Sequence, residues 1–432
     1  MFSPLRIVIA AAALVVVAAV AGPRDAAADG EPSCAVFPPN NPWNTDISGF
    51  PVHAQSDAFV DAIGRQQHLH PDFGTVWNGA PIGIPNVIVP GTQPEVPVTF
   101  DYADESDEGP YPVPPNAPIE GGANSGGDRH VLVIDDDNCV LYEMFDAHPM
   151  NGGQSWTAGS GAIFDLDSNA LRPDFWTSAD AAGLPIFPGL VRYEEVVQQG
   201  VIDHALRFTV QTTRRAFIHP ATHYASSQTA TNLPPMGLRF RMKAGYSCAA
   251  FSDEVRVICA ALKKYGMFVA DNGSDWYVSG APDSRWSDDR LGDLKDIPGD
   301  AFEVVDTGEP VITDEDRDND GDGYSNRTEG LVGTGTNDPC GWNGWPSDLV
   351  STGGSWNALT IEDAASFVAP VRRLGTSPGQ GDFSARWDLV PGSSAGAHIN
   401  VQDLAALFSG PTGYPPMMGG QRAFGQGCPY GP

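Results

Sequence analysis

Apolar and polar residues alternate over most of the region from Cys34 to about Asp306, and this period of two predicts short β-strands. In residues 130–145 two apolar runs flank an Asp-Asp-Asp-Asn turn, a pattern typical of a hairpin. Residues 205–210 and 237–243 also alternate, with arginines on the face opposite the apolar side chains. We therefore expect several strands with one apolar face each.

One stretch has the spacing of a helix instead. Ser252 is a good N-cap and Gly266 a typical residue just beyond a C-terminus. Between them, apolar side chains recur with a period near 3.6 residues. Many short strands and one clear helix predict a mainly β fold with a β-sandwich or jelly-roll-like core.

The N-terminus has the parts of a secretory signal peptide. Arg6 precedes the apolar run Ile7–Val20, and the small residues at Ala19–Ala21 and at Ala26–Ala28 offer two alternative cleavage sites. This predicts a signal peptide over residues 1–28 and a secreted, extracellular protein. An uncleaved anchor is the alternative, although the apolar run is short for a membrane span.

Composition divides the rest of the chain into three regions. The β-patterned core domain covers residues 34–308. Lysine then disappears, and Asp, Asn and Gly dominate residues 311–339, which we interpret as a calcium-binding loop segment. Residues 340–432 form the third region, which contains an internal repeat.

The chain is strongly acidic, with 24 Lys and Arg against 54 Asp and Glu and a formal net charge of −30. Phosphate recognition needs a basic face, so this balance argues against nucleic-acid binding and against docking on anionic lipid. A hydrophobic fraction of 41% is too high for a disordered acidic chain. No long apolar run follows the leader, so we expect no membrane span after its removal.

Six cysteines are spread along the chain, and secretion would allow them to form disulfides. No CxxC pair occurs, which argues against zinc ribbons and thioredoxin chemistry. The pairing stays open, although a bridge between Cys340 and Cys428 would hold the C-terminal region as a unit. Cys259 lies in the helical pattern and can equally remain free.

Residues 318–329 match the calcium-loop pattern D-x-[DN]-x-[DN]-G-x5-E at every specified position. Calcium takes about six to eight oxygen ligands, and alternate residues of a curled loop converge on one point. The expected ligands are Asp318, Asp320, Asp322, Tyr324 through its carbonyl, Asn326 and Glu329. We expect this calcium to be structural.

Two patterns recur at an offset of 40 residues in the C-terminal region. Asp348-Leu-Val350 returns as Asp388-Leu-Val390, and residues 359–367 align with residues 399–407. Two gapless matches at one offset indicate a duplicated unit, each copy an acidic loop followed by a short amphipathic helix.

Both features resemble known modules. Residues 314–338 resemble the calcium repeats of thrombospondin type 3 and EF-hand-like loops, and the duplicated unit looks like a dockerin module. Dockerins bind calcium and attach secreted enzymes to partners, so the likeness implies a protein partner. The loops at 351–354 and 391–394 lack the Asp and Asn ladder, and the resemblance does not extend to calcium ligands there.

No nucleophile elbow, zinc-protease helix, P-loop or dinucleotide fingerprint occurs. The candidate chemistry lies in polar residues inside strand patterns, where burial is costly unless something uses them. Glu143 is the candidate acid/base, with His130 and His204 as its partners. Arg207, for substrate charge, and His223 complete the catalytic set. A His/Glu metal site competes with this interpretation, as do purely structural histidines.

Aromatic and cationic residues offer a surface for sugars. Tryptophan faces stack on sugar rings, and arginines can bind carboxylated or sulfated sugars. The substrate-binding candidates are Trp156, Trp176, Trp276, Arg239 and Arg241. Core packing is the alternative for the tryptophans, and pairing with the abundant carboxylates is the alternative for the arginines.

These features predict a secreted carbohydrate-active protein that cleaves an extracellular polysaccharide, as a glycoside hydrolase or polysaccharide lyase. A non-catalytic carbohydrate-binding adhesin or lectin and a structural surface protein are the alternatives. The core is similar to a group of secreted bacterial proteins sharing His204-Ala-Leu-Arg-Phe-Thr and Ala270-Asp-Asn-Gly-Ser, which implies location and no activity. Convergence of Glu143, His130 and His204 in one cleft is the expectation specific to the enzyme.

Overall fold

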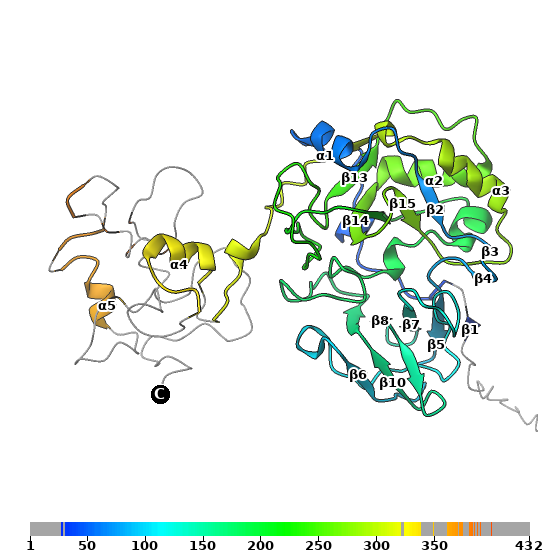
Figure 1. Cartoon of the computed structure of the whole chain (residues 1–432), viewed down its shortest axis with the longest axis horizontal. Coiled ribbons are helices and arrows are strands. Elements are labelled where there is room, and N and C mark those ends of the chain that lie inside the picture. The colour runs from blue at the N-terminus through cyan, green and yellow to red at the C-terminus, as the bar shows by residue number, and fades with distance from the viewer. Residues whose placement is uncertain are drawn as a thin grey trace, which may run out of the picture.

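The computed structural model describes residues 27–28, 31–320 and 324–337, together with separate positions between 349 and 399. Over these residues the chain is mainly β, with several sheets and few helices (Figure 1). The predicted mainly β, sandwich-like core with few helices is therefore confirmed. Residues 1–26 of the predicted signal peptide lie outside the described residues.

The first large sheet has five strands in the order β1-β5-β7-β8-β11. Its strands are β1 (Ala27–Ala28), β5 (Asn86–Val89), β7 (Val131–Asp135), β8 (Val140–Phe145) and β11 (Ser160–Asp165). Strands β5 and β7 run parallel, and the other neighbours are antiparallel. The predicted hairpin is the β7–β8 pair.

Strand β7 is buried on both faces. Leu132 and Ile134 face the main hydrophobic core, while Val131 and Val133 pack in a second cluster with Trp156. Trp156 belongs to a small sheet of β6 (Val98–Phe100), β10 (Ser155–Ala158) and β9 (His148–Met150). Because successive side chains point to opposite faces, this sandwiching explains the continuous apolar run of β7.

The second large sheet has six strands in the order β16-β13-β14-β12-β15-β2. Its strands are β16 (Phe302–Val304), β13 (Arg239–Met242), β14 (Met267–Asn272), β12 (Leu206–Val210), β15 (Tyr277–Ser279) and β2 (His70–Asp72). The expected helix is α2 (Asp253–Lys264), and it follows β13 and packs against it. A disulfide joins Cys259 of this helix to Cys248, so Cys259 is paired.

The remaining described elements are short. They are helices α1 (Ser56–Ile63), α3 (Asp288–Leu291), α4 (Asn326–Val332) and α5 (Ile361–Ala365); the hairpin β3 (Val76–Trp77) and β4 (Ala80–Pro81); and the helical turns Pro42–Asn44, Ala103–Glu105, Phe187–Gly189, Glu194–Gln199, Gly292–Asp296, Gly299–Ala301 and Asp314–Asp316. Among the helices of the described residues, none is long and apolar enough to cross a membrane.

The two large sheets share one hydrophobic core. Leu132, Ile134 and Leu141 of the first sheet belong to the same cluster as Phe208 and Trp276 of the second. Figure 1 shows the second sheet and α2 above, and the first sheet with β6 and β10 below. Side chains at the junction of the two sheets therefore come from segments that are far apart in the sequence.

The segment after β16 returns to this core before it leaves it. The backbones of Phe217 and Ile312 exchange two hydrogen bonds, of 3.0 and 2.8 Å. Asp314 then accepts hydrogen bonds from Tyr224 and pairs with Arg215 at 2.8 Å. Residues 312–314 are thus anchored on the β-rich core.

A third hydrophobic cluster lies in the C-terminal part, beyond the two sheets (Figure 1). Its buried members are Tyr324, Val332, Leu349, Phe367, Trp387, Leu389 and Ile399. Leu349 and Leu389 occupy equivalent positions of the predicted repeat, and both are buried in this cluster. Much of residues 338–432 lies outside the described residues, so the duplicated dockerin-like module stays a prediction.

Candidate functional site

A buried arginine marks the junction of the two sheets. Arg207 of β12 is 2% exposed, and its Nε donates to Oδ2 of Asp180 at 3.1 Å. Its Nη1 donates to Oγ of Ser279 in β15 at 2.6 Å, and its Nη2 lies 3.9 Å from Oδ2 of Asp271 in β14. A buried cation needs such partners, because an unpaired charge in the interior is strongly unfavourable.

A second cation comes from the first sheet. His130, just before β7, donates from Nδ1 to Oε2 of Glu120 at 2.6 Å and from Nε2 to the Ala179 carbonyl at 3.0 Å. Both ring nitrogens therefore face acceptors, an arrangement that suits the doubly protonated ring. Burial alone lowers the pKa of His130, but the charge and hydrogen bond of Glu120 raise it to about 9.

Three carboxyl groups surround this centre, and their pKa values move in different directions. Burial, together with the charge of Asp180, raises the pKa of Asp271 to about 7. Burial also raises the pKa of Asp72, with a further contribution from the charge of Glu120. Burial would also raise the pKa of Glu120, but the charge and hydrogen bond of His130 outweigh burial and lower this pKa. We call Asp72, Glu120, His130, Asp180, Arg207, Asp271 and Ser279 the junction cluster.

The junction cluster reaches the surface through its carboxyl groups. The side chains of Glu120 and Asp271 are 25% and 23% exposed, whereas those of Asp180 and Arg207 are buried. Asp72 is exposed and stands opposite Ser279 in the parallel pairing of β2 with β15. A molecule in solvent can therefore meet these three carboxyl groups without meeting the buried Arg207.

His223 lies next to the same region. The segment before it is fixed by backbone hydrogen bonds, because Ala182 donates to the carbonyl of Ala270 and accepts from the amide of His223. Nδ1 of His223 donates to the Ala181 carbonyl at 2.8 Å, and Nε2 lies 3.8 Å from Oε2 of Glu105. Nε2 of His223 therefore faces Glu105.

Glu143, the predicted acid/base, is placed differently. Its carboxylate lies in the interior with no exposed surface and accepts hydrogen bonds from the amides of Ile186 and Phe187 at 2.9–3.0 Å. Burial raises its pKa to about 7. It lies close enough to Asp180 and His130 to feel their charges, but a polymer in solvent cannot contact it.

Glu143 gives a prediction for stability. Its pKa is about 7 in the folded chain and about 4.5 when unfolded, so the folded state binds more protons between these values and stability falls as pH rises through them. We expect Glu143→Gln to remove this loss of stability, because the amide does not ionise. The amide oxygen can still accept both backbone hydrogen bonds, so the fold should be kept. Thermal unfolding of both proteins from pH 4 to 8 measures it. A stability difference that does not change with pH would contradict the prediction.

His204 belongs to another buried cluster. Its Nε2 donates to the carboxylate of Glu195 at 3.1 Å and its Nδ1 to the Ala205 carbonyl at 2.7 Å. Arg192 pairs with the same Glu195 and, at 2.7 Å, with Glu31. The hydrogen bonds of His204 are thus made to Glu195 and Ala205 and those of His130 to Glu120 and Ala179, so the two histidines share no partner.

The predicted substrate arginines are buried. Arg239 donates to the carbonyls of Tyr265 and Pro42 and lies over the ring of Phe268, and burial lowers its pKa to about 9. Arg241 donates to Glu303 at 3.0 Å and to the carbonyls of residues 47, 48 and 50. Both residues therefore fix the N-terminal segment to β13 and do not face a ligand.

Two of the three predicted tryptophans are buried and the third is half-buried. Trp156 and Trp276 are 1% and 0% exposed and belong to the hydrophobic clusters. Trp176 is half-buried beside Arg172. Among the tryptophans of the described residues, Trp77 is the exposed one, at 68%, on the β3–β4 hairpin five residues after Asp72.

Sequence reasoning missed Ser279 and the four carboxyl groups of the junction cluster, which are those of Asp72, Glu120, Asp180 and Asp271. One signal for them was available. Arg207 lies between apolar residues of a strand, and a buried arginine requires a carboxylate partner. That signal states that a partner exists but does not say which of the 54 acidic residues it is.

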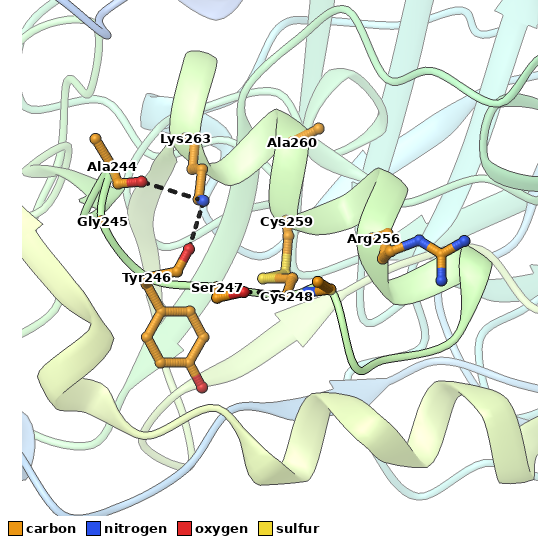
Figure 2. Close-up of a pocket in the computed structure, with 10 residues that line it drawn as sticks. Ala244, Gly245, Tyr246, Ser247, Cys248, Arg256, Cys259, Ala260 and Lys263 are labelled. Carbon is orange, nitrogen blue, oxygen red and sulfur yellow. Dashed lines mark hydrogen bonds between the residues drawn. A yellow bond between two sulfur atoms is a disulfide. The ribbon is translucent and has the colours of Figure 1, made fainter.

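A pocket of about 470 Å³ lies elsewhere, between α2 and residues 244–249 (Figure 2). The Cys248–Cys259 disulfide forms part of its wall, and Lys263 donates to the carbonyls of Ala244 and Tyr246. No Asp, Glu or His lines this pocket, so it lacks an acid/base pair. The junction cluster is the better candidate for chemistry.

Part of the predicted calcium loop is described. Glu329 is fully buried in the first turn of α4, and Asp318 and Asp320 precede it in the same loop. The side-chain amide of Asn326 donates to the Asp314 carbonyl, and its oxygen accepts from the amide of residue 319. Asp322 lies outside the described residues, and without it no three His, Cys, Asp or Glu side chains of the described part form a metal site.

No family model, curated protein or solved structure matches the chain. The resemblances to thrombospondin type 3 repeats, dockerins and secreted bacterial proteins therefore stay predictions.

Proposed function

We propose that this protein hydrolyses glycosidic bonds of an extracellular polysaccharide at the junction cluster, with Asp271 as general acid and Glu120 as its ionised partner. The proposal is carried by two carboxyl groups of one cluster that both reach solvent, Asp271 and Glu120, with exposed fractions of 23% and 25% and with pKa values displaced in opposite directions. The pKa of Asp271 is raised to about 7, while that of Glu120 is lowered. Glycosidases need one protonated and one ionised carboxyl group at the same pH.

The other members of the cluster support these two roles. Near neutral pH Asp271 holds a proton that it can donate to a leaving oxygen, and His130 keeps Glu120 ionised through a 2.6 Å hydrogen bond. Arg207 is a positioning residue, because it is buried and bound to Asp180 and Ser279. Asp271 thus takes the role that the sequence assigned to Glu143.

Charge favours a neutral polymer as the substrate. The groups of the cluster that reach solvent are carboxyls, and the predicted substrate arginines are buried. An acidic rim on a chain of net charge −30 repels polyanions. The exposed indole of Trp77 offers a stacking platform for a sugar ring.

A panel of polysaccharides tests the proposal. The full chain is incubated with neutral polymers (β-glucan, xylan and mannan) and with anionic ones (pectate and alginate), and reducing ends and ultraviolet absorbance are followed. New reducing ends from a neutral polymer, without an unsaturated product, are expected. An unsaturated product would replace hydrolysis by elimination, and the absence of product from every polymer would overturn the enzymatic proposal.

The exposed Trp77 also favours the second candidate, a non-catalytic carbohydrate-binding adhesin or lectin. Sedimentation of the chain with insoluble polymers distinguishes the two. Binding that Trp77→Ala abolishes, without any product, supports the lectin. Product formation excludes it as the whole function.

We also propose that residues 318–329 hold a structural calcium ion, which would neutralise part of the negative charge of this segment. Glu329 supports this proposal, because it places a carboxylate in a buried position at the end of the loop pattern. A calcium ion that binds the folded chain and not the unfolded chain would stabilise the C-terminal cluster around Tyr324.

We expect Glu329→Gln to weaken calcium binding by about tenfold or more, because a carboxylate ligand is lost. Calorimetric titration of the full chain with calcium chloride measures the affinity. Glu315→Gln is the matched control, since Glu315 is exposed in the neighbouring turn and pairs with Arg327. Equal calcium affinity of Glu329→Gln and wild type would remove this residue from the site.

A further inference from the structure

Two cysteines that are 105 positions apart in the sequence meet in the fold. Cys34 lies in the N-terminal segment, and Cys139 ends the turn between β7 and β8. Both are half-buried and pack against the main hydrophobic core. The pairing of cysteines could not be read from their spacing, so this contact is information that only the fold supplies.

Several contacts hold the two segments together. The amide of Ser33 donates to Oδ1 of Asp136 in the same turn, and the thiol of Cys139 lies close enough to that of Cys34 to shift its pKa. On the other side, the amide of Leu166 donates to the Cys139 carbonyl at 2.9 Å. The two sulfur atoms are therefore neighbours that are fixed by their backbones.

The surroundings of the pair do not favour a reactive thiolate. Burial, the neighbouring thiol of Cys139 and the nearby charges raise the pKa of Cys34 to about 12. Metal ligands and nucleophiles need the thiolate, which the environment here opposes. A structural cross-link made while the chain folds is the chemistry that remains, and the disulfide Cys248–Cys259 is a precedent in the same chain.

We propose that Cys34 and Cys139 form a second disulfide, which fastens the N-terminal segment to the β7–β8 turn. The two thiols lose two protons and two electrons, and an S–S bond forms between their sulfur atoms. The electrons and protons pass to an oxidant, such as oxidised glutathione, which becomes two thiols. The bond closes a long loop of the unfolded chain and leaves the folded state nearly unchanged.

Peptide mapping tests the proposal. The full chain is refolded from denaturant with oxidised glutathione, so that both thiols are exposed when they react, then alkylated in denaturant without reduction, digested and analysed by mass spectrometry. A cross-linked peptide pair containing Cys34 and Cys139 is expected, alongside the Cys248–Cys259 pair as internal control. Alkylated or glutathionylated Cys34 and Cys139, or either residue joined to another cysteine, would overturn the assignment.

Two variants measure its effect. Cys34→Ser should make Cys139 available for alkylation without reduction. If the two cysteines are not bonded in wild type, Cys139 is alkylated to the same extent in both proteins. The double variant Cys34→Ser, Cys139→Ser should unfold roughly 10 °C below wild type in non-reducing buffer, and wild type should fall toward it after reduction. Equal midpoints of wild type and the double variant in non-reducing buffer would contradict a stabilising cross-link.

Discussion

Replacing Asp271 with asparagine is expected to lower kcat of the proposed hydrolysis by a factor of roughly 10² to 10⁴, the usual contribution of a general acid. Asparagine has nearly the same shape but cannot deliver a proton to the leaving oxygen. The fold should persist, because Asp271 is the more distant of the two carboxylates around Arg207, at 3.9 Å from Nη2 against 3.1 Å for Asp180. Initial rates on the polymer that gives product in the panel measure the effect.

The pH dependence gives a second measure of the same assignment. Wild-type kcat/KM should fall as pH rises through about 7, because Asp271 then loses its proton. On the acidic side it should fall only below the ordinary range of a glutamate, because the pKa of Glu120 is lowered. Asp271→Asn should abolish the alkaline limb and leave the acidic limb in place.

The matched control is Asp289→Asn, which removes an exposed carboxylate of α3 away from the junction cluster. It should keep wild-type rates and both limbs of the profile. If Asp271→Asn keeps the wild-type rate as well, Asp271 is not the acid. If both variants lose activity equally, the loss is caused by the change in surface charge and not by loss of a general acid.

The largest expected loss of stability follows from Arg207→Met. Methionine fills much of the volume of the arginine, but Asp180 then stays in the interior without its cation. Breaking a buried ion pair by removing one partner typically costs about 3–5 kcal/mol. Denaturant unfolding of the full chain, followed by tryptophan fluorescence, measures the free energy of unfolding.

The double variant Arg207→Met, Asp180→Asn separates pairing from packing. It removes both charges, so it should recover part of the stability lost in the single variant. Arg256→Met removes a half-exposed arginine and should stay close to wild type. A double variant that is less stable than Arg207→Met would show that the arginine acts through its packing and not through its pair.

Periodicity predicted the strands and the helix well where apolar side chains recur every two residues, as in a strand, or about every 3.6 residues, as in a helix. The hairpin of β7 and β8 and the helix α2 are both found at the expected residues. Periodicity failed on the arginine faces of β12 and β13, which the pattern places opposite the core although Arg207, Arg239 and Arg241 are buried. A second layer covers these faces, and an alternating pattern carries no information about it.

The candidate site was predicted only in part, for a related reason. Glu143 and His130 stood out because polar residues in apolar strands need an explanation, and both lie near the junction of the sheets. Their neighbours Glu120, Asp180 and Asp271 come from two loops and the end of a strand. Only the packing of the two sheets brings such distant segments together, and nothing local in the sequence records that packing.

The anchoring of residues 312–314 on the core has a mechanical consequence. If the C-terminal part is held by a partner, tension along the chain enters the core first at Asp314, whose carboxylate accepts a hydrogen bond from Tyr224, the residue after His223. It then reaches Ile312, whose two hydrogen bonds join it to Phe217. A pull on the tether is thus delivered to the loop beside the junction cluster before it reaches either large sheet.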